Sequence, residues 1–232
     1  MKNYLAKKLF SISKWPLLFL AIIWTVFLYG YSTNDNQAIY GVLPRTLEGI
    51  KGIFLSVFIH GGLDHIASNS LPILILGMML FFWYKKIAKP AFIWIWIVSG
   101  IWLWIGGRNN EYHPIYHIGA STLIYGLATF LFFSGVFRKH LRLMVVSALV
   151  VFLYGSIMWG IFPLKEEISW EGHLFGAIAG LLTAFNYRKE GPQPRKFDWE
   201  DEKEDEDFPT SGNEREDNAI TINYVYKKDK DQ

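Results

Sequence analysis

Six stretches of the chain contain no Asp, Glu, Lys or Arg and are rich in large apolar residues. They cover residues 15–30, 66–84, 90–107, 118–137, 143–164 and 172–187. A helix that crosses a bilayer needs roughly 20 apolar residues. The four middle stretches are long enough alone, and the two outer ones are long enough with flanking residues. The pattern predicts an all-α, polytopic membrane protein in which residues 1–187 form a bundle of six transmembrane helices.

Basic residues alternate between the connections and predict the orientation. Most of them lie before the first stretch or after the second, fourth and sixth: Lys2, Lys7, Lys8, Lys14, Lys85, Lys86, Lys89, Arg138, Lys139, Arg142, Arg188 and Lys189. The other connections hold only Arg45, Lys51, Arg108 and Lys165. Positive residues collect on the cytoplasmic side of a membrane. We therefore expect a multi-pass protein of the cell (inner) membrane with both termini in the cytoplasm.

Composition and charge separate a membrane part from a polar tail. The 232-residue chain has no Cys, which excludes a disulfide framework, a cysteine-ligated zinc site and a cysteine protease. Residues 1–187 hold 14 Lys or Arg and 7 Asp or Glu, whereas residues 188–232 hold 9 and 14. The second segment has the composition of a largely disordered acidic tail. That cytoplasmic tail either binds a cytoplasmic partner or simply keeps the terminus solvated.

Polar residues at the start of the second stretch need a reason, because each is costly inside a membrane. His60, His65 and Asn69 have the spacing His-x4-His-x3-Asn. On a helix, His65 and Asn69 lie on one face. The pair fits either hydrogen bonds between helices or the polar side of a site.

The fourth and sixth stretches begin with a serine and a histidine. Ser121 follows Gly119, and Tyr125 lies one turn later. A serine at a helix start lies beside unpaired backbone N–H groups, which suit a developing oxyanion. His173 is followed by Gly176, one of a series of glycines at four-residue spacing that allows close helix packing.

Under the predicted topology, all of these residues lie at the outer ends of their helices. A serine, a histidine and an Asn/His pair at one depth can act as nucleophile, base and oxyanion donors. This placement favours serine hydrolysis inside the membrane over a purely structural use of the polar groups.

At these residues the sequence resembles the rhomboid family of intramembrane serine proteases, in its compact six-span bacterial form. The resemblance covers roughly residues 10–187, and the tail has no part in it. It rests on three motifs in order: the His60, His65 and Asn69 spacing, Gly119-x-Ser121, and His173-x2-Gly176-x3-Gly.

The resemblance implies a role for each of these residues. Ser121 would be the nucleophile and His173 its general base, without a carboxylate. Asn69 and His65 would donate to the oxyanion, and Tyr125 would stack on the catalytic histidine. His60 would be a supporting histidine near the oxyanion site. The implied partners are transmembrane segments of client proteins and the lipid bilayer, with no cofactor and no nucleic acid.

Two departures from the family pattern concern Thr122 and the first loop. The family usually has glycine directly after the nucleophile, and this chain has Thr122, whose β-branch adds bulk. Threonine is acceptable in a first helical turn, so we expect activity to persist. The Trp-Arg pair of the family's first loop is absent, and residues 44–46 (Pro-Arg-Thr) stand in its region.

Two alternatives remain open at this stage. One is a catalytically inactive rhomboid-like protein that binds transmembrane helices of clients, favoured only by Thr122. The other is a metal-binding membrane protein, because most histidines lie toward the predicted outer side: His60, His65, His113, His117 and His173. The chain has no His-Glu-x2-His motif.

Four polar residues near the site are not expected to take part in the chemistry. We expect His113 and His117 to be solvent-exposed loop residues rather than metal ligands. Asp64 and Glu171 are expected to be solvated at the outer rim, and we assign Glu171 no part in a triad.

Overall fold

The structure is a computed structural model that describes residues 2–153, 159–164, 168–191 and 193. The residues from Met1 to Pro194 form one compact unit. The predicted acidic tail, residues 188–232, lies almost wholly outside the described residues, so its predicted disorder remains a prediction.

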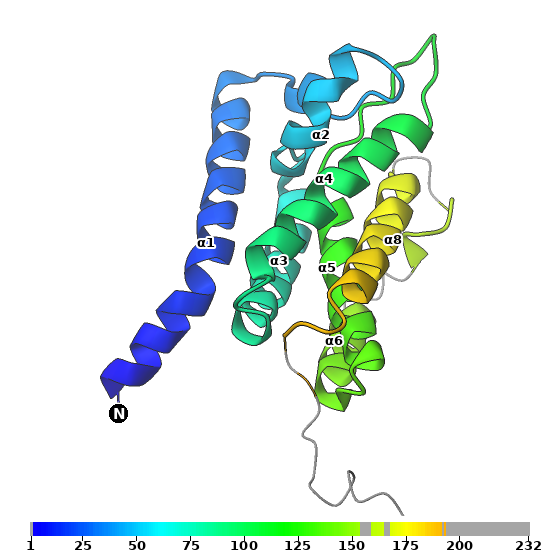
Figure 1. The fold of residues 1–232 in the computed structure, drawn as a ribbon. Coiled ribbons are helices and arrows are strands. Elements are labelled where there is room, and N and C mark those ends of the chain that lie inside the picture. The colour runs from blue at the N-terminus through cyan, green and yellow to red at the C-terminus, as the bar shows by residue number, and fades with distance from the viewer. Residues whose placement is uncertain (1, 154–158, 165–167, 192, 194–232) are drawn as a thin grey trace, which may run out of the picture. The chain divides into compact units, whose positions relative to one another are not determined.

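In the described parts, the chain is built from helices joined by loops (Figure 1). The long helices are α1 (Lys2–Thr33), α3 (Leu63–Trp83), α4 (Ala88–Gly106), α5 (Ser121–Phe137), α6 (Leu141–Leu153) and α8 (Trp170–Asn186). Between α1 and α3 lie the short segments η1 (Gln37–Tyr40), η2 (Glu48–Lys51), α2 (Gly52–Leu55) and η3 (Ser56–Phe58). An isolated antiparallel bridge joins Val42 to His117.

Length and apolar composition suit several of these helices to a membrane. Three are long and apolar enough to cross it, over Ala6–Thr33, Leu63–Trp83 and Ala88–Gly106, and Ser121–Phe137 is a shorter apolar helix. The predicted all-helical architecture is therefore confirmed. The predicted fifth span, residues 143–164, is described as a helix only to Leu153, because residues 154–158 are outside the described part. The number of spans stays a prediction.

Helices α5 and α8 pack closely at the centre of the unit. Leu123, Leu127 and Leu131 of α5 are fully buried. The glycine at position 176 of α8 is needed here, since a Cβ there would overlap the backbone carbonyl of Thr122 on α5. This close approach brings the starts of α5 and α8 together.

Large apolar side chains remain exposed along the outer helices, as a lipid-facing surface requires. Examples are Leu17, Leu18 and Ile22 of α1 and Ile93 and Trp94 of α4.

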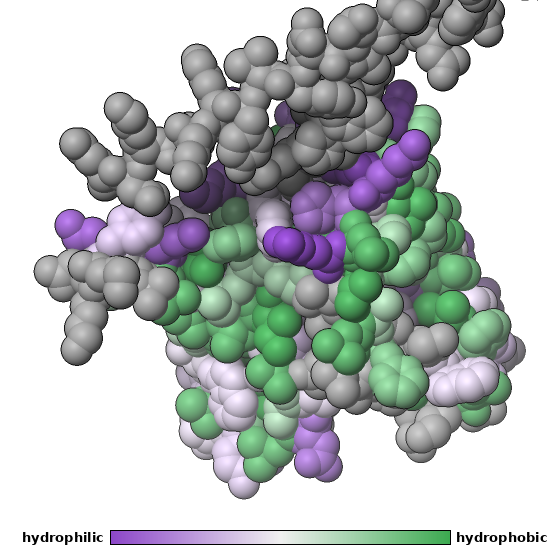
Figure 2. All heavy atoms as spheres, turned by 90° about the horizontal axis from the view of Figure 1, so that it is seen from below, coloured by the Kyte–Doolittle hydropathy of each residue, from purple (hydrophilic) through white to green (hydrophobic). Residues whose placement is uncertain are grey.

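Exposed basic residues lie at the end where α3 meets α4 and α5 meets α6: Lys85, Lys86, Lys89, Lys139 and Arg142. Figure 2 views the molecule from this end and shows hydrophilic residues beside mostly hydrophobic sides. The start of α1 lies at the same end (Figure 1).

Candidate active site

The predicted site residues come from the first turns of three helices. His65 lies in the first turn of α3, Ser121 is the first residue of α5, and His173 lies in the first turn of α8. The three side chains line one cavity of about 460 Å³, together with Asn69 and Tyr125. Residues separated by more than 100 positions in the sequence thus share one pocket.

Ser121 and His173 form a hydrogen bond, with 2.9 Å between Ser121 Oγ and His173 Nε2. On the other side of the ring, His173 Nδ1 lies 2.8 Å from the carbonyl oxygen of Gly160. A carbonyl oxygen can only accept, so the proton of a neutral His173 is on Nδ1. Nε2 then has its lone pair free to accept from the Ser121 hydroxyl.

Tyr125 holds the imidazole from one face. Its ring is stacked on that of His173, with 4.1 Å between centroids and 10° between planes. Tyr125 is buried and lies one helical turn after Ser121. The Gly160 carbonyl and this ring together limit rotation of His173, so Nε2 remains directed at Ser121.

Asn69 and His65, both on α3, also line the cavity. Asn69 Nδ2 donates to the His65 carbonyl oxygen at 2.7 Å, and the side chain is 5% exposed. The His65 ring packs against Gly119, whose φ of +105° favours glycine. A Cβ at that position would lie 2.6 Å from His65 Nε2. Gly119 thus makes room for His65.

The His60 ring contacts the His65 ring, with 4.9 Å between the ring centroids. The Ala120 N–H points at His60 Nε2 over 3.5 Å, which is a weak contact. Burial, with a smaller contribution from His65, lowers the pKa of His60 to about 4. His60 is therefore a neutral, buried residue that supports the loop before Ser121.

Comparisons with known proteins agree with this geometry. The Rhomboid domain model matches residues 48–190, which include every one of these residues. The chain belongs to the rhomboid family. It is also 32% identical over 177 residues to an uncharacterized protein of Mycobacterium tuberculosis, covering 73% of this chain and 72% of that one. A Bacillus subtilis protein named "Putative rhomboid protease YdcA" is 29% identical over 182 residues, covering 77% and 89%.

Two expectations about the rim of this rhomboid site are wrong. His117 was expected to be exposed, but it is 3% exposed, and burial lowers its pKa. Glu171 was expected to be solvated, but it is 3% exposed and forms an ion pair with Arg108 across 3.5 Å. Both residues are buried because the loop after α4 packs against the start of α8. His113 and Asp64 are exposed, as expected.

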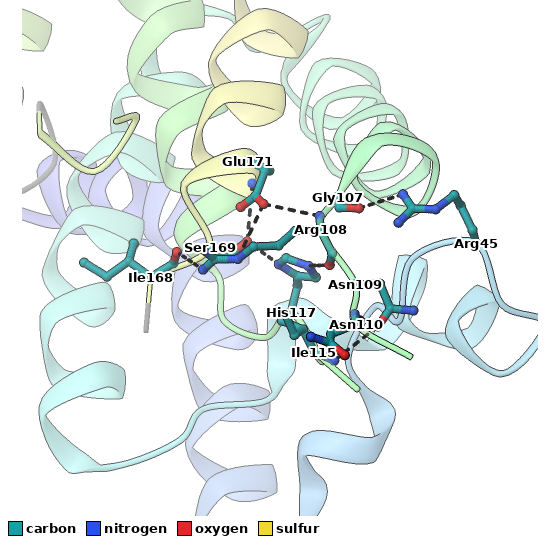
Figure 3. Close-up of polar contacts among 11 residues, drawn as sticks. Arg45, Gly107, Arg108, Asn109, Asn110, Ile115, His117, Ile168, Ser169 and Glu171 are labelled. Carbon is teal, nitrogen blue, oxygen red and sulfur yellow. Dashed lines mark hydrogen bonds and ion pairs between the residues drawn. The ribbon is translucent and has the colours of Figure 1, made fainter. Parts of the chain in front are cut away.

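The departures from the family pattern also have a structural context. Thr122 faces Gly172 on α8, where a Cβ would lie 2.7 Å from Thr122 Oγ1. In the first loop, the Arg45 guanidinium donates to the carbonyl oxygens of Ile105 and Gly107 at the end of α4. Figure 3 shows its contact with Gly107. Residues 44–46 therefore brace α4.

Sequence reasoning missed three residues that support the site of this rhomboid. Gly160 orients His173 through its backbone carbonyl. A Cβ at this position would overlap the Tyr125 hydroxyl oxygen and lie 2.7 Å from His173 Nδ1, so the contact requires glycine. A single glycine inside an apolar stretch gives no distinctive sequence signal.

Ser169 is the N-cap of α8, and its side chain accepts from the Gly172 N–H. Serine immediately before a helix is a recognisable cap signal. Arg108 did have a sequence signal, because it is a basic residue in a connection that is otherwise poor in them.

Metal binding has no support from the described parts of the chain. No group of three or more His, Asp or Glu side chains there could hold an ion. Of the histidines considered as ligands, His113 is exposed, and His173 has both ring nitrogens in hydrogen bonds.

Proposed function

We propose that this rhomboid is an intramembrane serine endopeptidase that hydrolyses peptide bonds in or near transmembrane segments of client proteins. The observation that carries the proposal is the hydrogen bond between Ser121 Oγ and His173 Nε2, with the His173 ring held by Gly160 and Tyr125. Nucleophile, base and orienting groups are the parts that activated-serine chemistry needs.

In the proposed mechanism, Ser121 Oγ attacks the carbonyl carbon of the client peptide bond. His173 Nε2 accepts the hydroxyl proton, and the carbonyl oxygen becomes an oxyanion. His173 then donates that proton to the leaving amine, and an acyl-enzyme forms on Ser121. A water molecule, deprotonated by His173, then attacks the ester. His173 returns that proton to Ser121 Oγ as the bond to the acyl group breaks, which releases the second product.

Three donors are proposed for the oxyanion. The Ser121 backbone N–H is at the start of α5, where helix N–H groups have no partner within the helix. The amide nitrogen of Asn69 carries two hydrogens, and one of them binds the His65 carbonyl oxygen. The other is available to the oxyanion, as is a proton on His65 Nε2. An oxyanion-hole donor typically contributes about 10²- to 10³-fold to kcat.

The proposed setting is the cell membrane, with six spans and both termini in the cytoplasm. The exposed basic residues at one end of the bundle support this orientation. The active site then opens on the outer side. A client helix hides its peptide bonds in its own hydrogen bonds. It must unwind locally to reach Ser121, so clients with glycine, proline or small residues near the cleavage point should be preferred.

The second candidate function is a catalytically inactive protein that binds client helices. Thr122 was the feature that favoured it. The Thr122 side chain faces Gly172, so its bulk is accommodated between the two helices. This weakens the case for inactivity, and the cleavage assay below separates the two functions.

The test is cleavage of model transmembrane substrates by the purified protein in liposomes. Substrates with a Gly- or Pro-containing membrane segment should be cut, and an all-leucine segment should resist. Ser121→Ala should abolish cleavage but still bind the substrate. Binding without cleavage by the folded wild-type protein would instead support the inactive binder.

A further inference from the structure

A second hydrogen bond joins the chain segments that lead into α5 and α8. His117 Nδ1 lies 2.6 Å from Ser169 Oγ. His117 is four residues before Ser121, and Ser169 is four residues before His173. The two contacts are therefore parallel links between the loop entering α5 and the segment entering α8.

For a neutral imidazole, the neighbours of His117 allow only one tautomer and so fix which group donates in the hydrogen bond with Ser169. His117 Nε2 lies 2.9 Å from the Arg108 carbonyl oxygen, so it carries the proton. Nδ1 then accepts from the Ser169 hydroxyl. The same Ser169 oxygen accepts from the Gly172 N–H at 3.3 Å, as the N-cap of α8. His117 thus orients the residue that starts the helix of the catalytic histidine.

His117 is itself fixed by its surroundings. Its backbone pairs with Val42, with N···O distances of 2.8 and 2.9 Å. The neighbouring Arg108 binds both α8 and the segment that precedes it. Its backbone N–H donates to Glu171 Oε1 of α8 at 3.2 Å, and its Nη2 donates to the carbonyl oxygen of Ile168, just before the N-cap, at 2.7 Å. Figure 3 shows His117 between the Arg108 carbonyl and Ser169, with Glu171 directed at the same loop.

We propose that His117 is a positioning residue for the reaction. It holds the first turn of α8, through Ser169, where His173 Nε2 reaches Ser121 Oγ. This rests on the proposed function. Ser121 and His173 lie on different helices, so their separation depends on how the two helix starts are held. A misplacement of about 1 Å in reacting groups can cost on the order of 100-fold in rate.

The experiment measures the rate constant and the final extent of labelling of Ser121 by a fluorophosphonate probe, in the full-length detergent-solubilised protein. The variants are His117→Ala, His117→Asn and His117→Gln. Asparagine can present an oxygen near the Nδ1 position and so bind Ser169, whereas glutamine reaches only toward the Nε2 side. His113→Ala, an exposed histidine of the same loop, is the matched control.

We expect His117→Ala to lower the labelling rate constant by about 10- to 100-fold, while the final extent stays at the wild-type level. His117→Asn should recover part of the rate and His117→Gln should not. Ser169→Ala should cause a similar loss and add little in the double variant with His117→Ala, because both remove one link. An unchanged labelling rate constant in His117→Ala would overturn the proposal. So would a lower final extent of labelling with a wild-type rate constant, because that result means that part of the protein is misfolded.

Hydrogen exchange of the Gly172 and His173 amides separates this proposal from the proposed function. His117→Ala should speed their exchange, and His113→Ala should not. If the folded wild-type protein takes no label, the proposed function fails. In that case, faster exchange in His117→Ala would still support the link to α8, and unchanged exchange would overturn it as well.

Discussion

In the proposed mechanism, the imidazole of His173 activates Ser121 without a carboxylate. In soluble triads an aspartate accepts from Nδ1 and holds the ring. Here the Gly160 carbonyl oxygen accepts from Nδ1, and Tyr125 stacks on the ring face. A neutral carbonyl avoids placing a charge in a membrane, which would be costly. Orientation comes from packing and one hydrogen bond.

At the same scale, His60 predicts how stability depends on pH. Its pKa in the folded protein is about 4, below the ordinary 6.5, because of burial. Between these values the unfolded chain binds more protons than the folded one. The part of the free energy of unfolding that depends on a neutral His60 is therefore fully present above about pH 6.5. It is lost as the pH falls from there through 4. The loss attributable to His60 is on the order of 3 kcal/mol.

Thermal unfolding in detergent between pH 7 and 4 checks this expectation. His60→Gln should reduce the fall in Tm, whereas the exposed control His113→Gln should keep it. The fall should shrink rather than vanish, because burial also lowers the pKa of His117. An equal fall in wild type and His60→Gln would contradict the assignment.

At the scale of the elements, the contact between α5 and α8 depends on which residues face one another. Thr122 follows Ser121, and Gly172 precedes His173. A Cβ at Gly172 would lie 2.7 Å from Thr122 Oγ1 and 2.9 Å from Ser169 Oγ. The two helices therefore fit only while one of the facing positions is small.

We predict that Gly172→Ala lowers the free energy of unfolding by about 1–3 kcal/mol, as overpacking typically does, and slows Ser121 labelling. Adding Thr122→Gly should restore part of the free energy of unfolding and part of the labelling rate. The loss that remains would come from the contact of the new Cβ with Ser169. Thr122→Gly alone completes the comparison, because it gives the effect of that substitution without the added Cβ. Strictly additive effects of the two substitutions would show that the residues are not coupled.

The loop between α4 and α5 is the element that sequence reasoning treated least well. Spacing along a helix predicted that His65 and Asn69 share a face, but no periodicity describes a loop. His113 and His117 look alike in sequence, yet one is exposed and the other is buried beneath the start of α8. The difference arises from the bridge to Val42 and the packing on α8, which are long-range contacts.

At the scale of the whole molecule, the apolar runs predicted where the helices lie, but they predicted the lengths of the helices less well. The predicted stretch 90–107 corresponds closely to α4 (Ala88–Gly106). The stretch 15–30 is only part of α1 (Lys2–Thr33). Charged residues end an apolar run but not a helix, since lysine side chains can extend along apolar surface and keep the ammonium in water.

The orientation of the chain can be measured directly because the protein has no Cys. We predict that a single cysteine at Glu111→Cys, between α4 and α5, reacts with a membrane-impermeant thiol reagent on intact cells. Lys86→Cys, between α3 and α4, should react only after lysis. Both positions are exposed, so accessibility differs only by the side of the membrane. The reverse pattern would contradict the proposed topology.

The most direct test of the central claim is fluorophosphonate labelling of purified wild-type protein beside Ser121→Ala and His173→Ala, with the labelled peptide located by mass spectrometry. The account predicts label on Ser121 in wild type and none in Ser121→Ala. Labelling of His173→Ala should be slower by at least about 100-fold, because the general base is gone. A folded wild-type protein without label, or equal labelling of His173→Ala, would contradict the claim that His173 activates Ser121.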